Sequence, residues 1–266
     1  MSRAWSLARF CAFLLAASLA AAPALAALTA EQLAGVGVQP PPDARLPLDA
    51  PLVDLDGRAT TLGQAFGGRP AVVVFTDYAC TQLCSPILAV TAGALSGSGV
   101  TPGVDYRLVV IGFNPRATAA DARRMVEGEI GDRALRRATT ALIAAEAVAN
   151  RLTAVVGYTY VYDESLRRYA HLAALFVVAG DGRVARILSG FAITDEDVRL
   201  ALVEAGKGAV GGLGDQIRLL CYGFNGAVGY YVDLVRTLLA AAGAATLIGV
   251  AGGVFAASRI ATRRRA

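Results

Sequence analysis

Short hydrophobic runs that alternate with more polar stretches predict an α/β fold for the middle of the chain. Residues 71–75 (AVVVF) and 106–111 (YRLVVI) are rich in β-branched residues, which is typical of strands buried on both faces of a sheet. A helix is expected after each run, over residues 81–95 and 118–130, and Thr118 suits the N-cap of the second helix. This strand–helix order predicts that the early strands are parallel.

Turn signals predict antiparallel hairpins on both sides of this unit. Residues 51–62 alternate around an Asp-Gly pair, and residues 172–178 and 183–189 flank a glycine-rich turn. The other expected elements are an alanine-rich helix over 134–150, a strand over 158–162 and a helix over 195–205 with Thr194 as its N-cap. The predicted fold class is α/β, with a thioredoxin-like three-layer core and a β-hairpin, although periodicity alone does not single out that core.

Two apolar segments stand apart at the ends of the chain. Residues 1–26 carry two early arginines, an apolar stretch and a final Ala-Leu-Ala, the pattern of a cleaved secretory signal peptide; retention as an anchor is the alternative. Residues 237–258 hold no charge over 22 positions, and roughly 20 suffice for a transmembrane helix. The arginines of residues 259–266 predict a cytoplasmic tail by the positive-inside rule, so the body lies outside.

The two end segments account for the net positive charge of the chain. The chain has 266 residues, of which 55% are hydrophobic and 17% charged, fewer charges than the roughly 25% of soluble domains. Six of the 25 cations lie in the two end segments, so residues 27–236 hold 19 cations against 21 acids and the net charge of +4 comes from the ends. This body shows no basic excess that would predict nucleic-acid binding, and it is long enough for one sizeable core.

The cysteines give the main chemical signal. Cys11 belongs to the signal segment, which leaves Cys80, Cys84 and Cys221. A spacing of four places Cys80 and Cys84 on one face where a helix begins, and a helix N-terminus favours the thiolate. Such a pair closes as a disulfide or holds a soft metal such as Cu(I). The spacing differs from a C-x-x-C redox motif, and no second cluster supports structural zinc, so a partial metal site is favoured over a zinc knuckle or a plain oxidoreductase motif. A structural disulfide is the alternative, and the placement in a loop between strand and helix disfavours it.

The single histidine, His171, precedes the strand expected from Leu172. Imidazole suits copper, and the loop of His171 is expected to approach the cysteine pair in a thioredoxin-like core, so His171 is the candidate third ligand. The alternative is an ordinary surface or core histidine. Cys221 is interpreted as a small residue close to the membrane, with a thiol relay as its alternative.

Four blocks in order resemble the Sco/SenC family, membrane-anchored thioredoxin-like proteins that handle copper for cytochrome oxidase assembly. The blocks, which cover roughly residues 48–210, are PLVDLDGRATTL, VVVFTDYACTQLCSP, YRLVVIGFNPRAT and YAHLAALFVVAGDGRVARILSG. Residues 201–225 resemble the bacterial branch that is anchored at its C-terminal end. The chain departs from the common family pattern at Thr81, Gln82, Ser85 and Asn114.

The resemblance implies a function and a site. It carries the copper ligands over to Cys80, Cys84 and His171, with copper as Cu(I) or Cu(II), and implies delivery to the binuclear site of the cytochrome c oxidase copper-binding subunit. A copper donor and a thiol reductant are further implied partners. Enzyme activity stays open: one alternative is a thiol–disulfide reductase with Cys80 and Cys84 as its redox pair, and another is a thiol peroxidase, for which Thr76 and Thr81 are the candidate supporting threonines.

The resulting domain organisation places the chain in a bacterial inner membrane with its functional domain on the periplasmic side. It comprises a signal peptide (1–26), a linker or arm (27–50), a thioredoxin-like domain (51–210), a membrane-proximal segment (211–236), a transmembrane helix (237–258) and a cytoplasmic basic tail (259–266).

Overall fold

The computed structural model describes residues 35–80, 84–164, 168–206, 222–225, 230–233, 245–246 and 248–249. The predicted signal peptide, Cys221 and nearly all of the predicted transmembrane segment lie outside these residues. Within the described part of the chain, no helix is long and apolar enough to cross a membrane.

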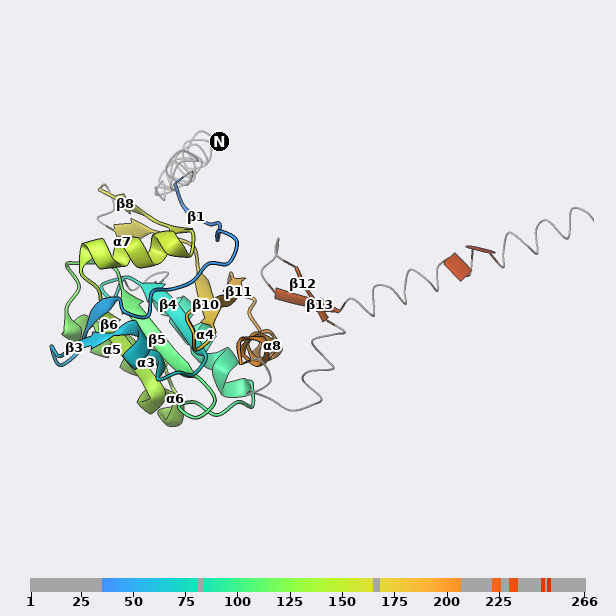
Figure 1. Cartoon of the computed structure of the whole chain (residues 1–266), viewed down its shortest axis with the longest axis horizontal. Helices are drawn as coiled ribbons and strands as arrows, with labels where there is room; N and C mark the ends of the chain where they lie inside the picture. Colours follow the sequence, from blue (N-terminus) through green and yellow to red (C-terminus); the bar gives the residue numbers. More distant parts are fainter. Residues whose placement is uncertain are drawn as a thin grey trace, which may run out of the picture. The chain divides into compact units, whose positions relative to one another are not determined.

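A seven-stranded mixed sheet forms the centre of the domain, in the order β11-β10-β4-β5-β6-β2-β3 (Figure 1). The parallel strands are β4 (Ala71–Thr76), β5 (Arg107–Gly112) and β6 (Thr139–Ile143). One edge is the antiparallel pair β10 (Ala174–Val178) and β11 (Val184–Ser189), and the other is the hairpin β2 (Pro51–Asp54) and β3 (Ala59–Thr61). The predicted parallel core and both predicted hairpins are therefore confirmed.

Helices cover both faces of this sheet. One face packs against α4 (Cys84–Gly97), α5 (Ala119–Glu129), α6 (Arg133–Ala138) and α8 (Asp195–Ala205), and the other against α3 (Leu62–Phe66) and α7 (Glu146–Val155). Along β4, Val72 and Val74 enter the first core, whereas Val73 and Phe75 enter the second. Every side chain of β4 is buried, and residues 71–75 are all apolar, as expected for a strand covered on both faces. The three-layer prediction is therefore confirmed.

Helix starts follow the predicted caps. The Oγ1 of Thr118 accepts from the backbone N–H of Asp121, while the Asp121 carboxylate accepts from the N–H of Thr118, a capping box for α5. Thr194 and Asp197 form the same arrangement at α8, which spans the predicted residues 195–205.

The prediction of one helix over residues 134–150 is wrong. The segment divides into α6, the strand β6 and α7, because Thr139–Ile143 pairs in parallel with β5 and completes the sheet. Its β-branched residues fit a strand, and pairing overrides the helical preference of the flanking alanines. Asp132 starts the shortened α6 by accepting from the N–H groups of Ala134 and Leu135.

The predicted strand over 158–162 is also divided, and each part pairs separately. β7 (Tyr158–Thr159) pairs with β1 (Gly37–Val38), and β8 (Val161–Asp163) pairs with β9 (Arg168–Ala170). A further two-stranded pair joins β12 (Tyr222–Asn225) to β13 (Tyr230–Asp233).

The described part of the predicted arm lies on the domain. The N–H of Leu46 donates to the Gly182 carbonyl over 2.8 Å, and the Leu46 side chain is buried. Directly after β1, the N–H of Gln39 donates to the carbonyl of Gly157, also over 2.8 Å. Residues 37–46 therefore contribute to the packed structure.

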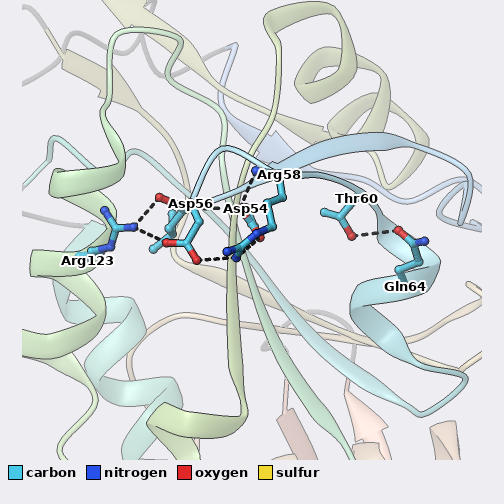
Figure 2. A network of polar contacts seen from close by, with 7 residues as sticks. Asp54, Asp56, Arg58, Thr60, Gln64 and Arg123 are labelled. Carbon is cyan, nitrogen blue, oxygen red and sulfur yellow. Dashed lines mark hydrogen bonds and ion pairs between the residues drawn. The ribbon is translucent and has the colours of Figure 1, made fainter.

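A polar network links the β2–β3 hairpin to α5 (Figure 2). The Nη2 of Arg123 donates to Asp56 Oδ1 over 2.8 Å and to the Leu55 carbonyl over 2.5 Å, while Arg58 Nη1 pairs with Asp56 Oδ2 over 2.7 Å. Asp54 accepts from the N–H groups of Arg58 and Asp56, and the first of these bonds is the main cause that lowers its pKa. The hairpin turn is thus held against the helix that borders the candidate site.

Candidate metal centre

The Cys80 turn begins where β4 ends. Asp77 Oδ1 accepts from the N–H of Ala79 over 3.0 Å, and the Asp77 carbonyl accepts from the N–H of Cys80, also over 3.0 Å. This Asx-type turn reverses the chain directly after the buried strand. Asn114, which follows β5, donates from Nδ2 to Asp77 Oδ1 over 2.8 Å and ties the turn to the neighbouring strand. Cys80 is half-buried, and the described part of the helix predicted over residues 81–95 is α4, which begins at Cys84.

Tyr78 fixes the same turn to the sheet. Its buried hydroxyl lies 2.8 Å from the Val110 carbonyl and 3.1 Å from the Leu142 carbonyl, so one proton is shared between two acceptors on β5 and β6. Burial raises the pKa of the Tyr78 phenol well above its usual range, which keeps it a neutral donor. The residue two positions before Cys80 is therefore anchored across two strands.

His171 lies at the same end of the sheet as this turn. β10 runs antiparallel to β4, with Phe176 opposite Val73. His171 precedes β10 and Cys80 follows β4, so this antiparallel pairing puts both residues beyond the same end of the two strands. The sheet pairing therefore places the histidine loop and the cysteine turn at the same end of the sheet, where β4 ends and β10 begins.

The His171 side chain is 8% exposed, so it is a core-flanking histidine. Its Nδ1 lies 2.8 Å from the Tyr158 hydroxyl oxygen and 3.0 Å from the Leu172 carbonyl oxygen, and the Tyr158 hydroxyl donates to that carbonyl over 2.8 Å. The ring also meets Phe113 edge to face, with centroids 5.6 Å apart. These contacts define the position of the imidazole.

The three predicted ligands are not assembled as a cluster among the described residues. No group of three His, Cys, Asp or Glu residues in that part of the chain is arranged to hold a metal ion. The backbone of Cys84 opens α4, and residues 81–83 between the cysteines lie outside the described residues. Cys80 and His171 lie at the same end of the sheet, where β4 ends and β10 begins. Cys84 follows in the first turn of α4.

The sequence prediction missed an aromatic cluster around His171. Its members are Phe113, Tyr158, Tyr160, Tyr162 and Tyr169, with neighbouring centroids between 4.3 and 6.3 Å apart. The signal was present in the alternating tyrosines of residues 158–162 (YTYVY), since alternate residues of an extended chain share a face.

Charged groups border this aromatic cluster. Arg116 donates from Nη1 to the Tyr162 hydroxyl over 2.6 Å, and its guanidinium carbon lies 4.8 Å from the Tyr162 ring centroid. Burial raises the pKa of Tyr169, with a smaller lowering contribution from Arg116 and a raising one from Asp77. Asp77 thus acts electrostatically on the aromatic cluster while it shapes the cysteine turn.

A cavity of about 290 Å³ opens beside Cys80 on the α5 side. Its lining residues are Tyr78, Ala79, Cys80, Asp121, Arg124, Met125 and Glu129. Arg124 and Asp121 form an ion pair at this wall, and Met125 accepts through its sulfur from Thr76 Oγ1 over 3.7 Å. An incoming group can therefore approach the Cys80 side of the turn through a cavity that has both apolar and charged lining residues.

Comparison with known proteins identifies the fold. No family model and no curated protein matches the chain. Among solved structures, a putative electron transfer protein from Aquifex aeolicus VF5 is 19% identical over 61% of this chain and 93% of its own, with a TM-score of 0.55.

Two further solved structures carry Sco descriptions. A SCO1/SenC family lipoprotein from Bacillus anthracis str. Ames is 15% identical over 62% of this chain and 97% of its own, with a TM-score of 0.50. BsSco, described as a member of the Sco family of cytochrome c oxidase assembly proteins with a disulfide switch, is 14% identical over 64% and 97%, with a TM-score of 0.51. The chain therefore has the thioredoxin-like α/β fold of Sco structures, whereas function must be argued from the site.

Proposed function

We propose that the chain is a Sco/SenC-type metallochaperone that holds one copper ion through Cys80, Cys84 and His171 and delivers it to the binuclear copper site of cytochrome c oxidase. The observation that carries the proposal is the position of the single histidine, at the same end of the β4–β10 pair as the Cys80 turn in a sheet like that of Sco structures. Two thiolates and one imidazole are a donor set that suits copper in either oxidation state.

The geometry supports a transfer site in particular. Cys80 is half-buried and lines an open cavity, so an acceptor thiolate can reach the metal and displace its ligands one at a time. His171 is held from its Nδ1 side by Tyr158 and Leu172, which keeps one ligand fixed while others exchange. The partners in this function are the copper-binding subunit of the oxidase, a copper donor and a thiol reductant.

The proposed location follows from the apolar ends of the chain. A signal peptide at residues 1–26 would export the body, and residues 237–258 would anchor it in a bacterial inner membrane. The functional domain then lies on the periplasmic side, with the arginine-rich tail in the cytoplasm. In this oxidising compartment the cysteines need a reductant before they can bind Cu(I).

The decisive experiment is His171→Ala in the purified full chain, with bound copper measured after loading with Cu(I). We expect loss of stoichiometric copper with the fold retained, as judged by circular dichroism. Tyr160→Phe is the control, because Tyr160 belongs to the same aromatic cluster and donates to Asn150 Oδ1 over 2.9 Å. Wild-type copper stoichiometry and affinity in His171→Ala would refute the three-ligand site.

A second candidate function is thiol–disulfide reduction, which the position of Cys84 at the start of α4, four residues after Cys80, favours. The Cys80 thiolate would attack a disulfide of the oxidase subunit, releasing one of its thiols and forming a mixed disulfide. Cys84 would then attack Cys80, release the second thiol and leave a Cys80–Cys84 disulfide, which an external dithiol would reduce. Cys84→Ser should trap the mixed disulfide, whereas His171→Ala should leave this exchange intact.

A further inference from the structure

We propose that Tyr158 is a positioning residue that holds the proton of His171 on Nδ1 and thereby presents the Nε2 lone pair to the metal. The inference rests on the proposed function for its consequence in copper binding. Its evidence is a triangle of contacts between the Tyr158 hydroxyl oxygen, His171 Nδ1 and the Leu172 carbonyl oxygen, with separations of 2.8, 3.0 and 2.8 Å.

The donors and acceptors of this triangle favour one tautomer of His171. The Leu172 carbonyl has no proton, so its contact with Tyr158 uses the single hydroxyl proton of the tyrosine. The tyrosine oxygen then faces Nδ1 with a lone pair, and the Leu172 carbonyl faces Nδ1 with another. Both contacts are attractive only if Nδ1 carries the proton, and in the neutral ring this leaves the lone pair on Nε2.

The opposite arrangement satisfies fewer groups. If the tyrosine proton pointed to Nδ1, the Leu172 carbonyl would lose that donor, and its lone pairs would face the Nδ1 lone pair over 3.0 Å. Two of the three residues are buried, where unmatched polar atoms are costly: Tyr158 is 2% exposed and His171 is 8% exposed, whereas Leu172 is 42% exposed.

Packing restricts the movement of the same two rings. The Tyr158 ring stacks on Phe75 with centroids 5.9 Å apart and meets Phe176 edge to face at 5.6 Å. Phe113, the residue that follows β5, meets His171 edge to face. Tyr158 therefore combines a hydrogen bond with a fixed ring position, the usual way in which an outer residue orients a ligating histidine.

Because His171 is the only histidine of the chain, isotope labelling gives a direct test. The full chain is labelled with ¹⁵N-histidine and reduced, and its single pair of ring nitrogens is observed by NMR without metal at about pH 8.5. We expect Nδ1 to carry the proton and Nε2 to be unprotonated in the wild type. Tyr158→Phe keeps the ring but removes the hydroxyl, and should give a mixture of both tautomers.

Copper binding supplies the second measurement. Competition against a chromophoric Cu(I) chelator should show affinity falling by about tenfold or more in Tyr158→Phe, as expected for loss of an outer hydrogen bond. Tyr160→Phe, which removes a neighbouring hydroxyl that bonds Asn150, should keep the wild-type tautomer and affinity.

Three results would overturn the proposal: a proton on Nε2 in the wild type, an unchanged tautomer ratio in Tyr158→Phe, or an equal loss of affinity in Tyr160→Phe. A wild-type chain that binds no copper would refute the proposed function and the consequence for affinity, while the nitrogen spectrum would still decide whether Tyr158 sets the tautomer.

Discussion

The ring of Tyr78 lies against Gly112 so closely that a side chain at Gly112 would overlap it. A Cβ built on Gly112 would lie 2.4 and 2.5 Å from two ring carbons of Tyr78. This close approach lets the Tyr78 hydroxyl reach the carbonyls of Val110 and Leu142. The last residue of β5 must therefore be glycine for the cysteine turn to adopt the observed position.

Gly112→Ala should accordingly destabilise the domain by about 2–3 kcal/mol, because a buried ring anchored by its hydroxyl cannot move aside without losing both acceptors. The measurement is the free energy of unfolding by denaturant titration. Gly128→Ala in α5 is the matched control: a Cβ there meets no atom within 4 Å, and alanine favours a helix, so this variant should be equally or more stable than wild type. Equal stability of both variants would contradict the packing argument.

The α5 capping box predicts a pH-dependent contribution from Asp121. Hydrogen bonds from Thr118 are the main cause that lowers the Asp121 pKa below 3.8. The ionised carboxylate therefore stabilises the fold: its contribution is complete above the unfolded pKa and is lost as pH falls through the lower folded pKa. Asp121→Asn should cost about 1 kcal/mol at neutral pH, and the difference from wild type should shrink below about pH 4.

The measurement for Asp121→Asn is the unfolding midpoint as a function of pH. Glu127→Gln removes an exposed carboxylate of the same helix and serves as the control. A stability difference for Asp121→Asn that stays constant down to about pH 2 would show that the carboxylate charge is not the source of the effect.

Gly157→Ala should release the arm that pairs through β1. Gly157 has a φ of +64°, and a Cβ there would lie 1.8 Å from the carbonyl oxygen of Gln39, so the alanine variant cannot keep this contact. The bond from the Gln39 N–H to the Gly157 carbonyl should break, with faster limited proteolysis around residues 36–40. Gly131→Ala, where a Cβ meets no atom within 4 Å, should leave the digestion pattern unchanged.

The link between the hairpin and α5 should contribute little to stability. The side chains of Arg123 and Asp56 are 45% and 55% exposed, so Arg123→Ala should cost no more than about 1 kcal/mol. The loss should also decrease at high salt, because exposed ion pairs are screened. Denaturant titration at low and high salt checks this, with Arg137→Ala, an exposed cation of α6, as the control. A loss above about 2 kcal/mol would indicate a structural role beyond the ion pair.

Local chemistry made much of the fold predictable from the sequence. The runs at 71–75 and 106–111 are strands because they are apolar on both faces, and Thr118 and Thr194 cap helices because their hydroxyls and the following aspartates satisfy the first N–H groups. Residues 139–143 were missed because their strand conformation depends on pairing with β5, which lies far from them in sequence.

For the candidate site, the sequence by itself determined the residue types and the predicted location of the protein. It shows two cysteines four residues apart after a buried strand, one histidine, and apolar segments at the ends of the chain. Only the tertiary structure decided how they are related. Antiparallel pairing of β10 with β4 puts His171 at the same end of these strands as the Cys80 turn, and packing places the Tyr158 hydroxyl against His171 Nδ1. These relations arise from sheet register and side-chain packing between distant segments, which no local pattern encodes.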